Sequence, residues 1–418
     1  MRVCFVSRRY WPALSGMSVY AEQHCRELVA LGHDVVLVSQ YRGDEAGTRV
    51  YGGGPPPPER VPAGVRVVAL ESHGEQVVGE GRPADFEADV AAMADAVVAL
   101  HAEAPFDVLH AQYAYPPGLA VLEASRRTGV PNLVSVQGGD GHWVGSCCDT
   151  HRDAMTTVLD HTGALLIGTR SFADEVTERL GTPSERFTVV GGATDTRRFT
   201  PSEGRPLGEL ADVPVLLFHG RVDARKGVME LLDAVAALVR DGRELRLVVS
   251  GIGPDSDAVR DRVEELGLGG VVAQTGYASH DQAPDVYRRA DVFVSPTWSE
   301  GFSNTVLEAM ASGLPIVSTA VVGVVDAVTD GVEAVLVPPR DVGALTAALE
   351  RVLDDEELRG RLAAAALETV RREHSWPVLT GRIAAVYDRL VGTAPDTDWR
   401  APAAVDPACR FRAAPHLL

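Results

Sequence analysis

Two glutamates, Glu300 and Glu308, have a spacing that suits the binding of a ligand with hydroxyl groups. We expect Ser303, which lies between them, to cap a helix whose first free backbone N–H groups attract phosphate. Glu300 would lie just before this helix and Glu308 about one turn inside it. Ionised carboxylates accept hydrogen bonds from hydroxyls, and a nucleotide sugar carries hydroxyls on both its ribose and its hexose. The segment therefore predicts a nucleotide-sugar site, with an ordinary capped helix and an acidic first turn as the alternative.

Basic residues follow the first strand that we expect in the second half of the chain. Arg221 and Lys226 occur in the run Phe218-His-Gly-Arg-Val-Asp-Ala-Arg-Lys-Gly227. Arginine grips phosphate oxygens through two nitrogens, and lysine supplies a compact charge, so the two suit the pyrophosphate of a departing nucleoside diphosphate. Solvated surface charges are the alternative, and the position at a strand end argues against them.

Short apolar runs alternate with longer amphipathic segments twice along the 418 residues. The first series has strand-like runs between Val3 and Val190, and the second between Val215 and Val337. Such alternation is typical of parallel sheets covered by helices on both faces. We therefore expect an α/β fold with two doubly wound, Rossmann-like domains whose strand ends face each other across a ligand-binding cleft.

The expected domain boundaries follow from a polar, proline-containing stretch around residues 200–213. They are 1–200 for an N-terminal, acceptor-binding domain and 201–374 for a C-terminal, donor-binding domain. We expect a last amphipathic helix at about 375–392 to pack back on the N-terminal domain. The tail, 393–418, is rich in proline and alanine and is expected to be irregular.

The two charged segments, with Ser250-Gly-Ile-Gly253 between them, resemble the retaining glycosyltransferases of family 4, which have the GT-B architecture. The resemblance covers nearly the whole chain. It implies that Glu300 contacts the donor sugar, that Glu308 contacts the ribose, and that Arg221 and Lys226 bind the pyrophosphate. It also implies donor contacts from nearby residues, namely Gly16, Gly220, Gly251, Gly253, Gly301, Phe302, Ser303 and Asn304.

The N-terminal half departs from the family pattern. Members usually carry a Gly-Gly pair in the first loop, where this chain has Gly16 followed by Met17. Many members place a histidine that contacts the transferred sugar where this chain has Gln137. Glutamine does not titrate, so Gln137 would act through hydrogen bonds.

Further candidates on the acceptor side are His110 and the residues after Gln137. His110 ends a strand, where it is expected either to face the cleft as a catalytic group or to be a structural histidine bonded to backbone. The expected acceptor contacts are Met17, Gln137, His142 and Trp143, with simple packing as the alternative for Trp143.

The resemblance implies a hexosyltransferase that transfers sugar with retention of configuration and needs no cofactor or metal. The donor base (UDP, GDP or ADP) stays open. The altered N-terminal motifs favour a small polar acceptor, such as a cyclitol, a thiol metabolite or a specialised-metabolite core, with a lipid or polysaccharide acceptor as the alternative.

Sugar phosphorylases and nucleotide-sugar epimerases share this architecture, and a non-catalytic binder is also an alternative. A dinucleotide oxidoreductase is disfavoured because no Gly-x-Gly-x-x-Gly turn follows the first strand.

Charge and hydropathy exclude several other classes. The formal net charge is −19, which disfavours nucleic acid and lasting membrane contact. No long apolar run and no signal peptide are recognisable, so we expect a cytoplasmic monomer or homodimer that meets only small-molecule partners.

Five cysteines are too few for a disulfide framework, and their odd number fits a reducing compartment. The pair Cys147-Cys148, with His142, Asp149 and His151 close by, is a candidate metal site, but its spacing differs from that of zinc clusters. Buried apolar packing is the alternative for these cysteines, and no metal site is predicted.

Overall fold

The computed structural model describes residues 1–13, 15–43, 52–74, 84–138, 141, 144–279, 281–401 and 409–413. The chain divides into two compact units. Unit 1 comprises residues 1–190 and 380–418, and unit 2 comprises residues 191–379. The first division falls before the boundary expected at residue 200, and the second falls inside the last long helix, α14 (Trp376–Leu390).

Unit 1 is built on a seven-stranded sheet with the order β3-β2-β1-β4-β5-β6-β7, and all its paired strands are parallel. Its strands are β1 (Arg2–Ser7), β2 (Asp34–Tyr41), β3 (Val65–Glu71), β4 (Val108–Gln112), β5 (Asn132–Val136), β6 (Ala164–Ile167) and β7 (Phe187–Val189). Val3 to Val6 of β1 are fully buried, as expected for a parallel strand covered on both faces. The strand order reverses between β1 and β4, and ligands of such sheets bind at the carboxyl ends of the strands at this point.

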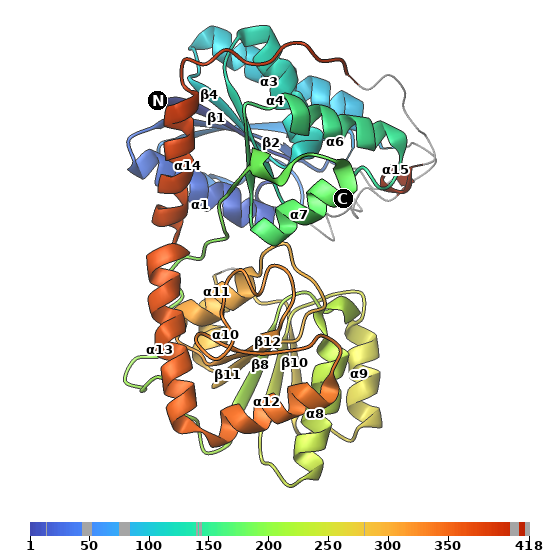
Figure 1. Cartoon of the computed structure of the whole chain (residues 1–418), viewed down its shortest axis with the longest axis vertical. Helices are drawn as coiled ribbons and strands as arrows, with labels where there is room; N and C mark the ends of the chain where they lie inside the picture. The colour runs from blue at the N-terminus through green and yellow to red at the C-terminus, as the bar shows by residue number, and fades with distance from the viewer. Residues whose placement is uncertain are drawn as a thin grey trace. The chain divides into compact units, whose positions relative to one another are not determined.

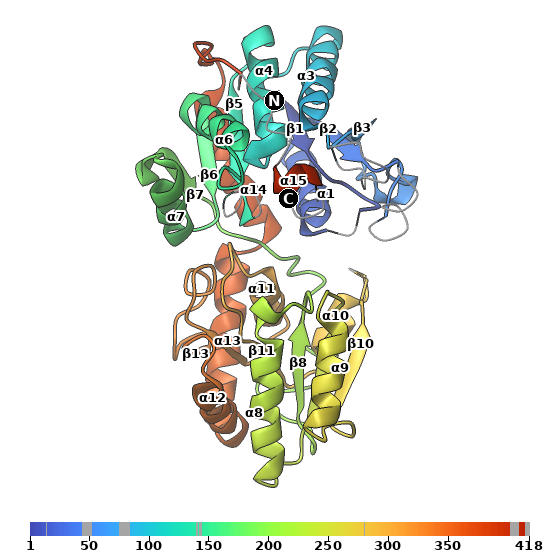
Figure 2. The same cartoon turned by 90° about the vertical axis from the view of Figure 1, so that its right-hand side faces the viewer.

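The helices of unit 1 cover both faces of its sheet (Figures 1 and 2). They are α1 (Gly16–Ala30), α3 (Phe86–Glu103), α4 (Leu119–Thr128), α6 (Asp149–His161) and α7 (Arg170–Leu180), with the short turns η1 (Pro58–Arg60), η2 (Ala114–Gly118) and η3 (Ser184–Arg186). The tail that we expected to be irregular contains a short helix, α15 (Arg410–Ala413).

Unit 2 repeats the plan with a six-stranded parallel sheet of order β10-β9-β8-β11-β12-β13. Its strands are β8 (Val215–His219), β9 (Arg246–Ser250), β10 (Val272–Gly276), β11 (Val292–Ser295), β12 (Ile316–Thr319) and β13 (Val335–Val337). Its helices are η4 (Ala224–Lys226), α8 (Val228–Arg240), α9 (Ser256–Glu265), α10 (Ala283–Arg288), α11 (Asn304–Ala311), α12 (Val342–Asp354) and α13 (Glu356–Glu373).

Two apolar clusters hold unit 2 together, one on each face of the sheet. Leu216 and Phe218 of β8 pack in the cluster that contains α8 and α12, whereas Leu217 packs in the cluster that contains α11. Successive side chains of a strand point to opposite faces, so a run of consecutive apolar residues supplies both clusters.

The structure confirms the predicted fold class, because both sheets are parallel and alternate with helices. Several predicted bounds agree closely; the last long helix was expected at about 375–392 and spans Trp376–Leu390. Among the described residues, no helix combines the length and apolar character required to cross a membrane.

Candidate functional site

The helix between the two glutamates is α11, and it begins at Asn304 with Ser303 as its N-cap residue. Glu300 precedes it and Glu308 lies in its second turn, so the first turn holds no acidic residue. The alternative explanation, that acidic residues in the first turn stabilise the helix dipole, therefore does not account for this pair of carboxylates. The prediction that the Ser303 side chain caps the helix is wrong, because this hydroxyl lies 3.4 Å from the Thr305 hydroxyl and caps no backbone N–H.

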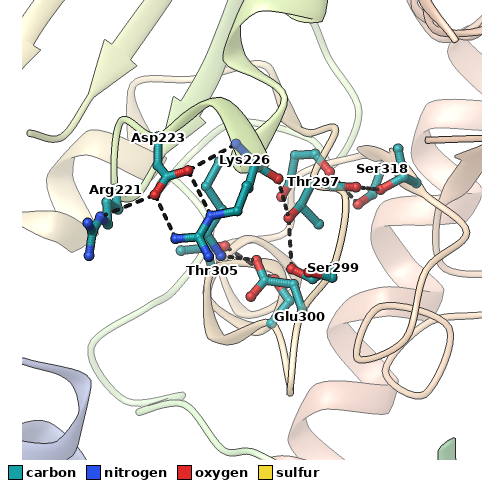
Figure 3. Close-up of polar contacts among 12 residues, drawn as sticks. Arg221, Asp223, Lys226, Thr297, Ser299, Glu300, Thr305 and Ser318 are labelled. Atoms are coloured by element: carbon teal, nitrogen blue, oxygen red, sulfur yellow. Dashed lines mark hydrogen bonds and ion pairs between the residues drawn. The ribbon is translucent and has the colours of Figure 1, made fainter. Parts of the chain in front are cut away.

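Lys226 contacts Glu300 directly. Its Nζ atom donates a hydrogen bond to Oε1 of Glu300 at 2.5 Å, across 74 positions of sequence (Figure 3). The Lys226 side chain is 31% exposed and that of Glu300 is 15% exposed, so a ligand can still reach both. A second link joins the same segments, because the Trp298 amide donates to the carbonyl of Arg225 at 2.8 Å. The structure thus places the ammonium group and the first carboxylate side by side.

Asp223 organises the loop that carries the basic residues. It is the N-cap of η4, and its carboxylate accepts hydrogen bonds from Nε of Arg225 at 3.1 Å and from its terminal nitrogen at 2.8 Å. These hydrogen bonds lower the pKa of the Asp223 carboxyl to about 2. Arg221 lies at 3.6 Å from the same carboxylate, and Figure 3 shows it on the opposite side of Asp223 from Lys226 and Glu300. Arg221 is 59% exposed and is therefore accessible to an anion at the edge of the site.

Glu308 has a different environment from Glu300. Its carboxylate accepts a hydrogen bond from the Tyr287 hydroxyl at 2.7 Å. Burial raises the pKa of the Glu308 carboxyl to about 7, against the lowering effects of this hydrogen bond and of Arg198. The ring of Tyr287 is fully buried between Phe199 and His219, so the hydroxyl that positions Glu308 is held in place by packing.

Two positions near this site require glycine, because the backbone of another segment approaches each of them closely. A Cβ atom on Gly251, whose φ is +152°, would lie 1.7 Å from the carbonyl oxygen of Gly220. A Cβ atom on Gly323, whose φ is +79°, would lie 2.5 Å from the carbonyl oxygen of Glu300. Both residues therefore lie against the predicted donor site at positions where any side chain displaces the backbone.

The segment after Glu300 is braced by the loop that follows β12. The Glu300 amide donates to the carbonyl of Val322 at 3.3 Å, and the Ser303 amide donates to the carbonyl of Gly323 at 3.1 Å. The Ser303 amide, which was expected to meet phosphate, is thus committed to this loop in the structure. Asn304 is exposed at the helix start, and Gly301 and Phe302 are partly buried. Gly253 is also a point of close approach, to the carbonyl of Val222.

In unit 1 the structure brings Met17 and Gln137 together through Gln112. The Gln112 amide nitrogen lies 3.3 Å from both the Met17 carbonyl and Oε1 of Gln137, and its oxygen accepts from the Ser7 hydroxyl at 2.8 Å. Gln137 is partly exposed, whereas Met17 is only 7% exposed and contributes mainly its backbone. Gly16 is exposed at the start of α1, and the space that a Cβ atom would take there is open among the described residues.

His110 is a packing residue in this structure. It is fully buried, and its ring nitrogens lie 2.6 Å from the Tyr387 hydroxyl and 2.8 Å from the Ser135 hydroxyl. Burial lowers its pKa well below the ordinary value. The Tyr387 hydroxyl also lies 3.1 Å from His24, so this cluster ties α14 to α1 and β4. A catalytic contact of His110 with substrate is not supported, because no part of the ring is exposed. His142 and Trp143 lie outside the described residues.

The sequence of this chain matches two protein-family models, one for each half. Residues 202–369 match the model for glycosyl transferases group 1, and residues 15–193 match the glycosyl transferase 4-like domain. The D-inositol 3-phosphate glycosyltransferase of Stackebrandtia nassauensis is 30% identical over 85% of this chain and 83% of its own length. The chain belongs to the family 4 glycosyltransferases.

Other relatives of this glycosyltransferase agree on the chemistry and the fold. The glycogen synthase of Mycobacterium tuberculosis is 27% identical over 93% of this chain and 94% of its own length. The structure of sucrose-phosphate synthase from Thermosynechococcus elongatus superposes with a TM-score of 0.74 at 21% identity, covering 93% of this chain and 98% of that one. The GT-B fold is therefore shown, and the enzyme is a glycosyltransferase.

Sequence reasoning overlooked one feature of this glycosyltransferase that needs no structure. Lys226 is the only lysine among the 39 lysine and arginine residues of the sequence. A chain that uses arginine at every other basic position keeps lysine where its Nζ atom contacts Glu300, which indicates that a compact ammonium group is required there. Gln112, Asp223 and Gly323 were also missed, although each follows or ends a strand; Tyr287 carries no comparable signal.

Proposed function

We propose that this glycosyltransferase moves a hexose-type sugar from a nucleoside-diphosphate sugar to a small polar acceptor, with retention of configuration. The observation that carries the proposal is the contact between Lys226 and Glu300 beside the start of α11. It puts a compact cation, a carboxylate and a helix N-terminus in one place, which suits a phosphate joined to a sugar.

The donor is held by groups of unit 2. Lys226 and the start of α11 bind the pyrophosphate, and Arg221 reaches it from the edge of the site. Glu300 accepts hydrogen bonds from the sugar, and Glu308 accepts them from the ribose. Because Lys226 and Glu300 pair with each other in the structure, the donor must loosen this pair when its phosphate takes the ammonium group and its sugar takes the carboxylate.

In the transfer step, the bond between C1 of the sugar and the phosphate oxygen breaks, and a bond to C1 from the acceptor oxygen, or from the sulfur of a thiol acceptor, forms on the same face. The acceptor proton passes to the leaving phosphate. The positive charges stabilise the diphosphate as it leaves, so the step needs no metal ion. The acceptor is expected to contact the exposed Gly16 and the Gln137 amide in unit 1.

The single lysine offers a direct test of the donor site. Reductive methylation modifies amines, so in this chain it can modify only Lys226 and the N-terminal amine, which serves as an internal reference. The nucleoside diphosphate that gives the largest thermal shift, chosen among UDP, GDP and ADP, should slow methylation of Lys226 and leave that of the N-terminus unchanged. Equal methylation of Lys226 with and without that ligand would refute the proposed phosphate contact.

Variants at the same two positions test the catalytic roles. Glu300→Gln and Lys226→Ala should each reduce donor turnover at least about 100-fold, whereas Lys226→Arg, which keeps the charge but not its compact shape, should fall between. Lys226→Ala should also weaken binding of the nucleoside diphosphate, and Glu300→Gln should not, because it frees Lys226 for phosphate. Near-normal turnover in both variants would reject the assignment.

The acceptor requires its own measurement. The inositol phosphate transferase among the relatives supports a small polar acceptor, and the glycogen synthase supports a polysaccharide. Donor turnover with cyclitols, thiol metabolites and glucans, each followed by product mass, separates these classes. Turnover that depends on inorganic phosphate, or that needs no acceptor, would favour a phosphorylase or an epimerase instead.

A further inference from the structure

A cluster of three cysteines and one histidine lies in unit 1. Its members are Cys147, Cys148, His151 and Cys409, and their ligand atoms all lie within 4.8 Å of one another. Nδ1 of His151 is 3.1 Å from Sγ of Cys147 and 3.3 Å from Sγ of Cys409. Cys409 comes from the C-terminal segment, 258 positions after His151, and is brought here by the fold.

We propose that these four side chains bind one zinc ion that fastens the C-terminal segment, residues 409–413, to unit 1. Three cysteines and one histidine are an established ligand set for structural zinc. With Zn–S bonds of about 2.3 Å and a Zn–N bond of about 2.0 Å, the ligand atoms of a tetrahedral site lie about 3.5 to 3.8 Å apart. The longest separation in the cluster must therefore shorten by at most about 1 Å, and the two Nδ1–Sγ distances must lengthen by a few tenths of an ångström, to complete the site.

Helix α6 and two aromatic rings position two of the four cluster residues, Cys148 and His151. Cys148 is the N-cap residue of α6, where the positive end of the helix dipole favours a thiolate. His151 lies in the first turn of the same helix and is fully buried. Its ring centroid lies 4.7 Å from that of Tyr115 and 5.9 Å from that of Phe86, which fixes the ring orientation.

The C-terminal segment carries a buried arginine, Arg412, three residues after Cys409. Arg412 is 3% exposed in its side chain and donates hydrogen bonds to the carbonyl of Ala84 at 2.9 Å and to Glu87 at 2.8 Å. Three thiolates and one zinc ion leave one net negative charge, and Arg412, although paired with Glu87, also interacts electrostatically with Cys409. Cys409 and Phe411 are each 2% exposed, so the short helix α15 is buried against unit 1 at this point (Figure 1).

A four-ligand site of this kind is closed, since no coordination position is left for a substrate. The metal would therefore stabilise the fold and take no part in the transfer step. Zinc is favoured over calcium or magnesium, because thiolate and imidazole are not ligands for hard cations.

Metal content tests the proposal without any measurement of activity. The full chain, purified under reducing conditions and desalted, should hold about one zinc per chain by elemental mass spectrometry. Cys409→Ser and His151→Ala should each lower zinc retention at least about tenfold, the effect expected for loss of a metal-binding contact. Cys25→Ser removes a buried thiol outside the cluster and should retain full zinc, which controls for general damage to the fold.

Two measurements on the wild-type protein, cobalt substitution and proteolysis, test the proposal even if a variant fails to fold. Wild-type protein stripped by a chelator and reloaded with Co²⁺ should show the absorption of tetrahedral cobalt with thiolate charge transfer. Chelation should also speed proteolytic cleavage of the C-terminal segment, and added zinc should restore protection. Folded, reduced protein without stoichiometric zinc and without the cobalt spectrum would overturn the proposal, as would a disulfide among these cysteines in the protein isolated from cells.

Discussion

Binding of the nucleoside diphosphate should depend on pH through Glu308. Burial raises the pKa of this carboxyl to about 7, and the proposed ribose contact requires its ionised form as acceptor. Protonation at low pH converts one carboxylate oxygen of Glu308 into a hydrogen-bond donor. The ribose hydroxyls would also donate at this point, so the protonated form loses an acceptor for them. Affinity should therefore rise with pH up to about 7 and level off above it.

The size of the effect follows from the pKa. If only the ionised form binds, the apparent dissociation constant is multiplied by 1 + 10^(pKa − pH). Between pH 8 and pH 6 this factor rises from about 1.1 to about 11, a tenfold weakening worth about 1.4 kcal/mol. In Glu308→Gln this contribution disappears, since an amide keeps the carbonyl acceptor at every pH.

Isothermal titration calorimetry with the best-binding nucleoside diphosphate measures the effect. The terminal phosphate of the ligand itself titrates near pH 6, so the wild type must be compared with Glu308→Gln at each pH. At pH 7, titrations in buffers of different ionisation enthalpy should show about half a proton more released by the wild type. Tyr287→Phe removes the hydrogen bond that lowers the pKa of Glu308, so its affinity gain should move to higher pH. An identical pH dependence in the wild type and Glu308→Gln would refute the reasoning.

Two further predictions concern the backbone of unit 2 and the buried cluster of unit 1. Gly251→Ala forces a Cβ onto the Gly220 carbonyl at a positive φ and should cost about 2 kcal/mol or more in the free energy of unfolding, whereas Gly269→Ala meets open space and should be nearly neutral. Urea unfolding that finds the two alanine variants equal would contradict this account. Tyr387→Phe deprives His110 and His24 of a shared hydroxyl partner and should lower the free energy of unfolding by about 1–3 kcal/mol. If its urea midpoint matches the wild type, the hydroxyl does not hold α14 in place.

The sequence by itself determined the fold class and singled out the segments that carry Lys226 and Glu300. The alternation of short apolar runs with amphipathic segments is a local property of the sequence, so it predicts strands and helices before any contact is known. The helix expected at about 375–392, which spans Trp376–Leu390, is one example. The family resemblance implied that Lys226 and Glu300 contact one donor. The strands that precede them, β8 and β11, are neighbours in a parallel sheet, and the two side chains lie 2.5 Å apart.

Tertiary structure alone decided the partners that come from distant positions. His110 was expected to end its strand and to face a ligand, yet it lies in the middle of β4, and its ring contacts the hydroxyl of Tyr387, 277 positions later. Cys409 likewise completes a cluster that Cys147 and Cys148 leave unfinished. Local patterns report which side chains are buried, but the groups buried against them depend on how a remote segment packs. The roles of His110 and of the cysteine cluster therefore became visible only when the chain was folded.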